Sequence, residues 1–445
     1  ATDSNNVAVG YDAGQAVTTG VKNVLIGGLA GDALTDADFN VAVGYAALGA
    51  DTLGSRSTAL GYLALSAQNF TTATDAYNTA VGMFAGGLVT TGTANTLIGG
   101  LSGDAITTGA FNTGVGTGSL GALTTGSNNV AIGEVALDAS TEAGDNVAVG
   151  VSALGADVLG SRSVAVGRAA LTSQNFTTAT ETYNVAVGYN AGGAVTTGTE
   201  NTLIGGISGD ALTTGIRNVA VGSAALTGDT KGQNNVAVGY GTLAAQNFTT
   251  VVSSYNVAVG AAAGLSVTTG FQNTLVGGLA GDALTDADYN TGFGYLALSA
   301  DTLGSNSTAI GTFALTNQNF TTATDSHNTA VGYNAGGNTT TGVQNTFLGS
   351  LAGDAITTGF ANVAIGFQAL SSDDVGTNTV AIGQNALFAQ NFSTATATYN
   401  VAVGQSAGAA VTTGTNNTLI GGLAGDALTS AVRNVAVGKG ALSSD

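Results

Sequence analysis

The sequence predicts an all-β protein whose chain winds into a parallel β-solenoid of about 25 coils. Three observations predict this fold. A five-residue motif, first seen as Asn6-Val7-Ala8-Val9-Gly10, recurs along the whole chain; its copies are almost evenly spaced; and the composition is rich in glycine and free of proline. A short, fixed period over a whole chain is typical of a solenoid, in which each repeat supplies one coil.

The spacing between copies of the motif gives the size of each coil. The closing glycines lie 17 residues apart except at five gaps of 21, which follow Gly61, Gly167, Gly239, Gly311 and Gly383. Each gap holds the extra loop Gln-Asn-Phe-Thr-Thr or, once, Gln-Asn-Phe-Ser-Thr. We therefore predict one continuous solenoid over residues 1–445, with internal repeat units 1–73, 74–179, 180–251, 252–323, 324–395 and 396–445.

The middle of the motif has the character of a strand. Position 2 is Val or Thr, position 3 is usually Ala, and position 4 is always apolar. Because β-branched residues favour strands and side chains alternate between the two faces, positions 2 and 4 share one face and position 3 lies on the other. Apolar residues on both faces indicate a strand buried on both sides. One face is expected to line the solenoid interior and the other to meet a partner chain.

Position 3 also varies in size. It is large in a minority of coils, at Leu25, Leu97, Leu203, Leu275, Phe347 and Leu419. In the same coils the residue after the closing glycine is small, at Gly28, Gly100, Gly206, Gly278, Ser350 and Gly422. We interpret this pairing as volume compensation on one packed face.

Positions 1 and 5 are predicted to be structural. The glycine at position 5 never varies, which predicts a corner that needs a positive φ or close backbone packing; examples are Gly10, Gly27, Gly44, Gly61, Gly82, Gly99, Gly188, Gly260, Gly332 and Gly404. Asn at position 1 predicts a turn residue that stacks in a ladder from coil to coil; examples are Asn6, Asn23, Asn40, Asn78, Asn95, Asn184, Asn256, Asn328 and Asn400. It is replaced only at Ser57, Ser163, Ser307 and Thr379.

Composition and charge exclude several classes of function. The chain has 8 basic and 27 acidic residues, a formal charge of −19, and no cysteine. Binding to nucleic acid or to an anionic membrane surface needs clustered Lys and Arg, so neither is expected. Disulfides and cysteine-based metal sites are excluded outright. No apolar run is long enough to span a bilayer, so membrane insertion is not expected.

The repeat has a counterpart among known proteins. The string Asn184-Val185-Ala186-Val187-Gly188-Tyr189-Asn190-Ala191 resembles the head repeats of trimeric autotransporter adhesins (YadA-like), and similar strings occur in repetitive tail-fibre proteins of bacteriophages. The resemblance implies a left-handed parallel β-roll, three chains packed side by side, and display outside the cell for binding host matrix or other surfaces. The family's coil is shorter, so this roll is expected to be wider and able to fill its own core. Neither a coiled-coil stalk nor a membrane anchor is visible in this sequence.

The sequence holds little that points to catalysis or metal binding, and we predict no catalytic residue, metal or cofactor. His327 is the one histidine and fills a place held by tyrosine in other units, so no catalytic triad or histidine metal cluster can be built. A column of aspartates recurs at Asp32, Asp104, Asp210, Asp282, Asp354 and Asp426. Its members lie four coils or more apart, too far to share one calcium ion. Two local clusters could hold calcium, at Asp32, Asp36 and Asp38 and at Asp282, Asp286 and Asp288, but a solvated acidic loop is the favoured interpretation of both.

Two further patterns have functional readings. Asn-Phe-Thr or Asn-Phe-Ser fits the N-glycosylation acceptor pattern and begins at Asn69, Asn175, Asn247, Asn319 and Asn391; Asn306, Asn338 and Asn416 also fit it. The alternative is an Asn/Phe corner that packs on the roll. Thr-Thr-Gly corners, such as Thr18-Thr19-Gly20, raise the option of ice binding, but adjacent threonines on a strand would point to opposite faces.

These observations predict a non-catalytic structural or adhesive fibre protein, located outside the cell or on its surface. Its expected partners are copies of itself, packed as a lateral trimer, stacked head to tail, or both, together with surface glycans or other cells. One alternative is a phage tail-fibre shaft on a virion. A carbohydrate-cleaving solenoid would need two unlike carboxylates at a set distance, and an ice-binding solenoid is the remaining alternative.

Overall fold

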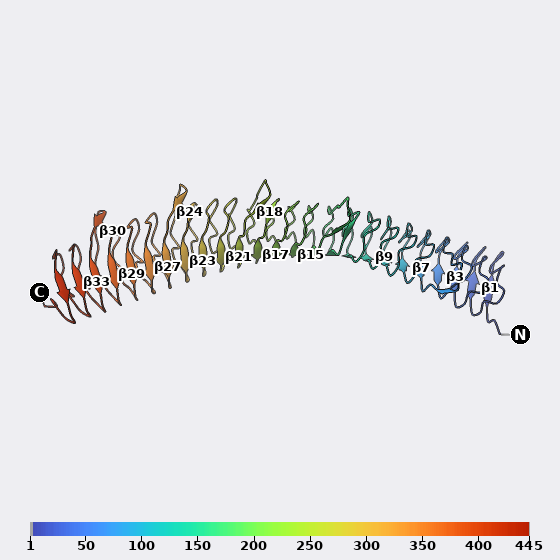
Figure 1. The fold of residues 1–445 in the computed structure, drawn as a ribbon, viewed down its shortest axis with the longest axis horizontal. Coiled ribbons are helices and arrows are strands. Elements are labelled where there is room, and N and C mark those ends of the chain that lie inside the picture. Colours follow the sequence, from blue (N-terminus) through green and yellow to red (C-terminus); the bar gives the residue numbers. More distant parts are fainter. Residues whose placement is uncertain (1–2, 445) are drawn as a thin grey trace. The chain divides into compact units, whose positions relative to one another are not determined.

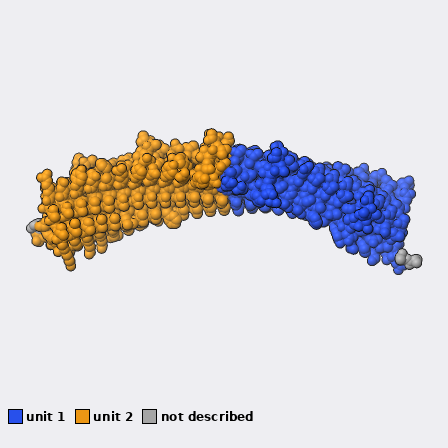
Figure 2. All heavy atoms as spheres, viewed as in Figure 1, with its two compact units in different colours: residues 1–218 blue, residues 219–445 orange. Residues whose placement is uncertain are grey.

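The computed structural model describes residues 3–444, and in this range the chain forms short strands and turns without a helix. The chain divides into two compact units, residues 1–218 and 219–445, which Figure 2 shows in blue and orange. Each unit is a stack of coils, and each coil contributes one three-residue strand at the recurring motif (Figure 1). The predicted parallel β-solenoid of about 25 coils is confirmed. Its continuity from end to end and its six repeat units stay predictions.

The main strands of the first unit cover positions 2 to 4 of the motif. They are β1 (Val7–Val9), β2 (Val24–Ile26), β3 (Val41–Val43), β5 (Thr58–Leu60), β7 (Thr79–Val81), β8 (Thr96–Ile98), β9 (Thr113–Val115), β10 (Val130–Ile132), β11 (Val147–Val149), β13 (Val164–Val166), β15 (Val185–Val187) and β16 (Thr202–Ile204).

The second unit repeats the arrangement. Its main strands are β17 (Val219–Val221), β19 (Val236–Val238), β21 (Val257–Val259), β22 (Thr274–Val276), β23 (Thr291–Phe293), β25 (Thr308–Ile310), β27 (Thr329–Val331), β28 (Thr346–Leu348), β29 (Val363–Ile365), β31 (Val380–Ile382), β33 (Val401–Val403), β34 (Thr418–Ile420) and β35 (Val435–Val437).

Within each unit, every main strand pairs in parallel with the next one, without a shift in register. Val7, Ala8 and Val9 lie beside Val24, Leu25 and Ile26, 17 residues further on. The register is the same across a 21-residue gap, where Thr58 pairs with Thr79. The four extra residues are therefore accommodated outside the main sheet.

Each 21-residue coil forms a small two-stranded parallel sheet with the coil before it, outside the main sheet. These sheets pair β4 (Gly54–Ser55) with β6 (Thr74–Asp75), β12 (Gly160–Ser161) with β14 (Thr180–Glu181), β18 (Gly232–Gln233) with β20 (Val252–Ser253), β24 (Gly304–Ser305) with β26 (Thr324–Asp325), and β30 (Gly376–Thr377) with β32 (Thr396–Ala397). In Figure 1, β18, β24 and β30 lie on the side of their coils away from the main strands.

The core of each coil is built around position 3 of the motif. From Leu25 onward this residue is buried in every main strand, whereas positions 2 and 4 stay partly or fully exposed. Position 3 therefore faces the solenoid interior, and positions 2 and 4 form an outer face. Buried leucines of the following turn, such as Leu48 and Leu65, complete the interior.

The predicted volume compensation uses different residues from those the sequence suggested. Cβ atoms at Gly14 and Gly31 would lie only 2.7 and 2.8 Å from the methyl groups of Leu25. A Cβ at Gly28 would instead meet the ring of Tyr45 at 3.6 Å. The interpretation that the residue after the closing glycine compensates for a large position 3 is therefore wrong. The strand leucine occupies the space that turn leucines such as Leu48 fill in other coils, so glycine is needed in the turn.

The closing glycine of each motif, which includes all ten predicted corner glycines, has a positive φ. Gly99 has φ of 138°, a conformation that L side chains rarely adopt. A Cβ at this position would lie 2.5 Å from the carbonyl oxygen of Gly116 in the next coil. The corner thus combines an unusual backbone conformation with backbone contact between neighbouring coils.

Two adjacent glycines test this constraint. Gly99→Ala is expected to lower the free energy of unfolding by about 2 kcal/mol or more, because it adds both backbone strain and a clash. Gly100→Ala is expected to change it by less than about 0.5 kcal/mol, because a Cβ there meets nothing within 4 Å. Urea unfolding of the two variants measures the difference. Equal losses in both would show that coil stacking tolerates a side chain at the corner.

Candidate functional site

The largest uniform surface of each unit is the outer face of its main strands. We call positions 2 and 4 of these strands the outer strand face. Every residue on it is Val, Thr, Ile, Leu or Phe, so the face carries no charge. Exposed fractions reach 40 % at Ile132 and 55 % at Phe293. Each unit thus presents a long uncharged strip, which is apolar at position 4 and carries Val or Thr at position 2, with Thr in 11 of the 25 main strands. Large exposed patches with apolar residues often mark interaction sites.

Tyrosines border this face on both sides. Seven of them directly follow a closing glycine, namely Tyr11, Tyr45, Tyr62, Tyr189, Tyr240, Tyr295 and Tyr333. The other five directly precede an asparagine of position 1, namely Tyr77, Tyr183, Tyr255, Tyr289 and Tyr399. Together they account for all 12 tyrosines of the chain, and every one of them is about half exposed or more. Rings in neighbouring coils meet, stacked at Tyr45 and Tyr62 with centroids 5.7 Å apart and edge to face at Tyr295 and Phe313 with centroids 5.8 Å apart.

Most basic residues occupy the same two border columns. They are Lys22, Arg56, Arg162, Arg168, Arg217, Arg433 and Lys439, seven of the eight in the chain. Arg56 lies 5.0 Å from the centre of the Phe39 ring and pairs with Asp75 at 2.9 Å. Such exposed pairs contribute little to stability. Their effect is to arrange cationic and aromatic groups along the edges of an uncharged strip.

His327 lies in one of these columns. It directly precedes Asn328, is exposed, and has φ of 51°, like the tyrosines at the equivalent place in other units. His327 therefore occupies the same environment as the tyrosines that precede position 1 in other units.

The position-1 asparagines form an internal ladder within each unit, which is interrupted only at the four positions where Ser or Thr replaces Asn. The side-chain oxygen of Asn23 accepts a hydrogen bond from the backbone N–H of Asn40 at 2.9 Å, and its amide donates to the carbonyl of Ala37 at 2.7 Å. The same pair of bonds recurs along the chain, and the predicted ladder residues from Asn23 to Asn400 are buried. Each asparagine therefore satisfies two backbone groups of the next coil, which buried backbone groups require.

The structure also contains five buried polar junctions that sequence reasoning missed. Each lies at a 21-residue coil and centres on a fully or almost fully buried aspartate, at Asp51, Asp157, Asp229, Asp301 and Asp373. In the first junction, Asp51 accepts hydrogen bonds from the backbone N–H groups of Gly54 and Phe70, both at 3.1 Å, and from the side chain of Gln68 at 2.6 Å. Three donors around one buried carboxylate compensate for much of its lost hydration.

The same junctions explain why the asparagine ladder is interrupted. Gln68 donates to the hydroxyl of Ser57 at 3.0 Å and accepts from the amide of Asn78 at 2.8 Å. The glutamine side chain therefore bridges from the coil of Ser57 to Asn78, and the smaller serine leaves room for it. Equivalent contacts join Gln174, Gln318 and Gln390 to Ser163, Ser307 and Thr379. The four replacements of asparagine thus belong to four of the five junctions.

A signal for these junctions was present in the sequence. In each of the five cases an aspartate precedes the glutamine of the extra loop by 17 residues, which is one coil. Stacked coils place such residues side by side, so the pairing could have been predicted. The burial of the aspartate could not, because its column holds Leu34 and Val89 in other coils.

Two adjacent aspartates test the junction. Asp373 is buried and accepts bonds from the backbone N–H of Gly376 at 3.1 Å and from Gln390 at 2.6 Å. Asp373→Asn places an amide donor against one of these donors, so we expect a loss of about 1–3 kcal/mol in the free energy of unfolding. Asp374 is exposed and its carboxylate accepts from Thr357, a bond that Asp374→Asn can keep. Chemical unfolding measures both; equal stability would mean that the junction contributes nothing.

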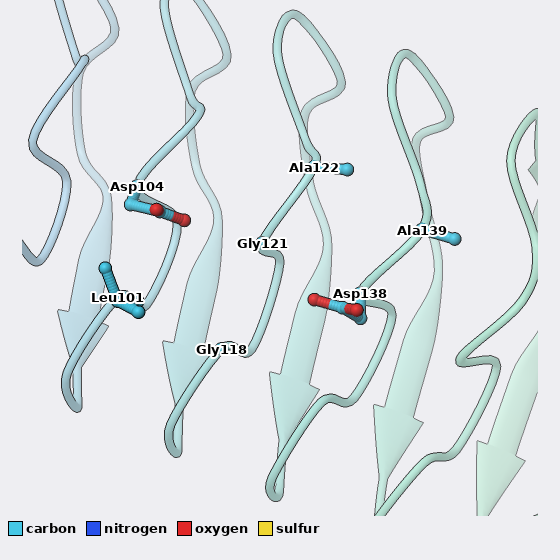
Figure 3. A pocket seen from close by; sticks show the side chains of 7 residues that line it. All are labelled: Leu101, Asp104, Gly118, Gly121, Ala122, Asp138 and Ala139. Carbon is cyan, nitrogen blue, oxygen red and sulfur yellow. The ribbon is translucent and has the colours of Figure 1, made fainter.

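The predicted column of aspartates lies in the turn regions, and one part of it differs from the rest. Asp104 and Asp138 point toward each other from opposite sides of the coil that contains Gly118 and Gly121 (Figure 3). They flank a hollow of about 360 Å³, which Leu101, Ala122 and Ala139 also line. Partial burial is the main cause that raises the pKa of both carboxyl groups, and the charge of Asp138 raises that of Asp104 further. Asp138 occupies the same place in its coil as the aspartates of the column, five residues after a closing glycine, although it was not among the six predicted members.

The two local clusters suggested for calcium use their carboxylates within the protein. Asp36 accepts a hydrogen bond from the hydroxyl of Thr19 at 2.5 Å, and Asp38 accepts one from the backbone N–H of Val21 at 2.7 Å. Asp286 and Asp288 repeat both contacts. Across residues 3–444, no three acidic, histidine or cysteine side chains come together as a metal site would require.

The pH dependence of stability tests the environment of Asp354, a member of the aspartate column. Burial raises the pKa of its carboxyl group from 3.8 to about 6. Because the folded-state value is the higher one, this carboxyl group stabilises the fold fully below pH 3.8, and that stabilisation is lost as the pH rises through about 6. We expect Asp354→Asn to reduce the fall in thermal midpoint between pH 4.5 and 7.5. An unaltered profile in Asp354→Asn would contradict the assignment.

The first threonine of these corners engages its hydroxyl group within the solenoid, whereas the second is exposed, as at Thr91 and Thr108. Thr90 donates to the carbonyl of Thr107 at 3.1 Å, and Thr107 donates to that of Thr124 at 3.2 Å. This row is therefore a ladder between coils, comparable to the asparagine ladder. The five asparagines proposed for glycosylation occupy the equivalent place in the 21-residue coils, where their side chains are exposed.

Comparison with known proteins gives no family for this chain. No model of a known protein family matches it, and a search of curated proteins finds no similar sequence. Over the part of the chain that the structure describes, there is no helix with the length and apolar character needed to cross a membrane.

Proposed function

We propose that this protein is a non-catalytic structural or adhesive extracellular fibre protein that associates with copies of itself through the outer strand face. The observation that carries the proposal is this uncharged strip of Val, Ile, Leu, Phe and Thr, which runs along the coils of each unit between two borders that hold all the tyrosines and seven of the eight basic residues. The resemblance to adhesin head repeats agrees with it, since that family packs three chains side by side.

The dimensions of the face suit an interface. In the first unit, twelve main strands stacked at about 4.8 Å give a strip on the order of 50 Å long. Its width is about 10 Å over the strand residues and roughly twice that with the borders. The resulting area, on the order of 500–1,000 Å², is comparable to the roughly 800 Å² per partner of a typical stable interface.

The charge of the chain favours the same surface. A formal charge of −19 opposes the approach of two copies, and the repulsion is weakest where no acidic side chain is present.

Stacking of copies end to end belongs to the same proposal. The ladder contacts between coils use strand backbone and position-1 asparagines, groups that every coil presents to the coil before it and to the coil after it.

Charge substitutions in the same two coils test the role of the face. Ile98→Lys with Val115→Lys places two charges on the outer strand face, and we expect the dissociation constant of self-association to rise at least about tenfold. Thr108→Lys with Thr125→Lys adds the same charge at exposed positions away from the strands and should leave association unchanged. Analytical ultracentrifugation measures both. A wild-type chain that stays monomeric at about 0.1 mM, or equal effects of both pairs, would contradict the proposal.

The alternatives differ in what they predict for native particles. Fibres of indefinite length would accompany a structural or adhesive role, and appendages of fixed length on a virion would indicate a phage tail-fibre shaft; negative-stain microscopy separates the two. Asp104 and Asp138 are the carboxylates on which a carbohydrate-cleaving role would depend, since that chemistry needs a facing pair.

A further inference from the structure

We propose that the five Asn-Phe-Thr and Asn-Phe-Ser loops are sites of N-linked glycosylation, and that the fold distinguishes them from the other three acceptor sequences. The five asparagines are Asn69, Asn175, Asn247, Asn319 and Asn391, and the other three are Asn306, Asn338 and Asn416. Sequence alone makes all eight equivalent, because each has Ser or Thr two residues later.

The loops hold the acceptor asparagine in a defined position. The backbone N–H of Asn69 donates to the carbonyl of Thr90 at 3.0 Å, and the next residue, Phe70, is 6 % exposed. The ring of Phe70 packs where Gly54 has no side chain, since a Cβ there would lie 2.8 Å from it. The other four loops repeat the backbone bond and the buried phenylalanine. The backbone hydrogen bond and the buried phenylalanine therefore hold the loop in place on the solenoid.

The reactive groups of these loops face solvent. All five asparagine side chains are exposed, and so is the Thr or Ser two residues later, such as Thr71. Within residues 3–444, the side-chain nitrogen of none of the five donates a hydrogen bond to the protein. Three of the side-chain oxygens accept one, from Thr52, Thr230 and Thr302. The nitrogen that would carry a sugar is thus free in all five loops. At Asn69, Asn247 and Asn319 the hydrogen bond to the side-chain oxygen also orients the side chain.

The other three sequences lack one or more of these features. The amide of Asn306 donates to Asp325 at 2.8 Å, and the acceptor threonine Thr308 lies in strand β25. Asn416 donates to Thr415 at 3.1 Å and precedes Thr418 of strand β34. For Asn338, the hydroxyl of Thr340 donates to the carbonyl of Thr357 at 3.2 Å. In each case the asparagine or its threonine is already engaged in the fold.

The transfer itself forms one bond and breaks another. The side-chain nitrogen bonds to the anomeric carbon of a sugar supplied by a lipid diphosphate-linked oligosaccharide, the anomeric C–O bond to that donor breaks, and the nitrogen loses one proton as the diphosphate leaves. Strands β18, β24 and β30 lie away from the main strands (Figure 1), and each pairs with a two-residue strand that follows one of the loops, at Val252–Ser253, Thr324–Asp325 and Thr396–Ala397. The proposal is independent of self-association through the outer strand face.

The test is intact mass and peptide mapping of the protein isolated from the cells that produce it. Release of the sugars with peptide N-glycosidase in ¹⁸O-labelled water converts each modified asparagine to labelled aspartate. We expect labels at the five loop asparagines and none at Asn306, Asn338 and Asn416. Thr71→Ala should abolish modification at Asn69 and leave the other four loops modified, with the chain still folded.

Three outcomes would overturn the proposal. A protein-only mass excludes glycosylation, and labels at all eight sites would show that the fold does not select among them. Persistence of the label at Asn69 in Thr71→Ala would show that the modification does not depend on the acceptor sequence.

Discussion

The structure depends on how closely the backbones of neighbouring coils approach at the corner that ends each main strand. Gly99 lies so near the carbonyl of Gly116 that no side chain fits between them. The parallel hydrogen bonds of the sheet set this distance, and the positive φ of the glycine turns the chain out of the strand. A corner of this kind repeats once per coil, so the period of the sequence is a direct consequence of the stacking.

The interior of the solenoid is a fixed volume, and different coils fill it with side chains from different positions. Leu25 extends from the strand over Gly14 and Gly31, whereas Leu48 enters the same region from the turn of another coil. Native packing density leaves no room for both. A coil with leucine in the strand therefore needs glycine in the turn, so the two positions change together.

The buried junctions serve as the polar counterpart of this packing. In the column where other coils hold Leu34 or Val89, Asp51 and Gln68 follow one another and bond to each other. A buried carboxylate with specific donors accepts few other neighbours, so the pair favours one alignment of the 21-residue coil with its neighbours. Identical apolar coils lack such a preference, because a shift by one coil would bury similar groups.

The sequence predicted the fold well because each coil repeats the same physical requirements. Alternation at Val7, Ala8 and Val9, an invariant Gly10 and a period of 17 define a parallel solenoid without further information. What sequence reasoning missed depends on contacts between different coils. The replacement of asparagine by Ser57 was visible, yet its cause, the side chain of Gln68, lies in the turn of the same coil and was not connected to it. The inward direction of position 3 likewise could not be assigned while both faces of the strand were apolar.

The residues that determine the fold are separate from those that form the outer strand face, and this bears on function. The fold is determined by the corner glycines, the asparagine ladder and position 3, none of which contributes to the outer strand face. That face could therefore have diverged toward polar residues at little cost in stability, as exposed positions of a sheet usually tolerate. It nevertheless keeps Val or Thr at position 2 and an apolar residue at position 4 in every main strand, while all tyrosines lie along its borders. β-branched residues at position 2 favour the strand itself, but the strand does not require the absence of every charged side chain from positions 2 and 4. This absence is the physical argument for the proposed surface that meets another molecule.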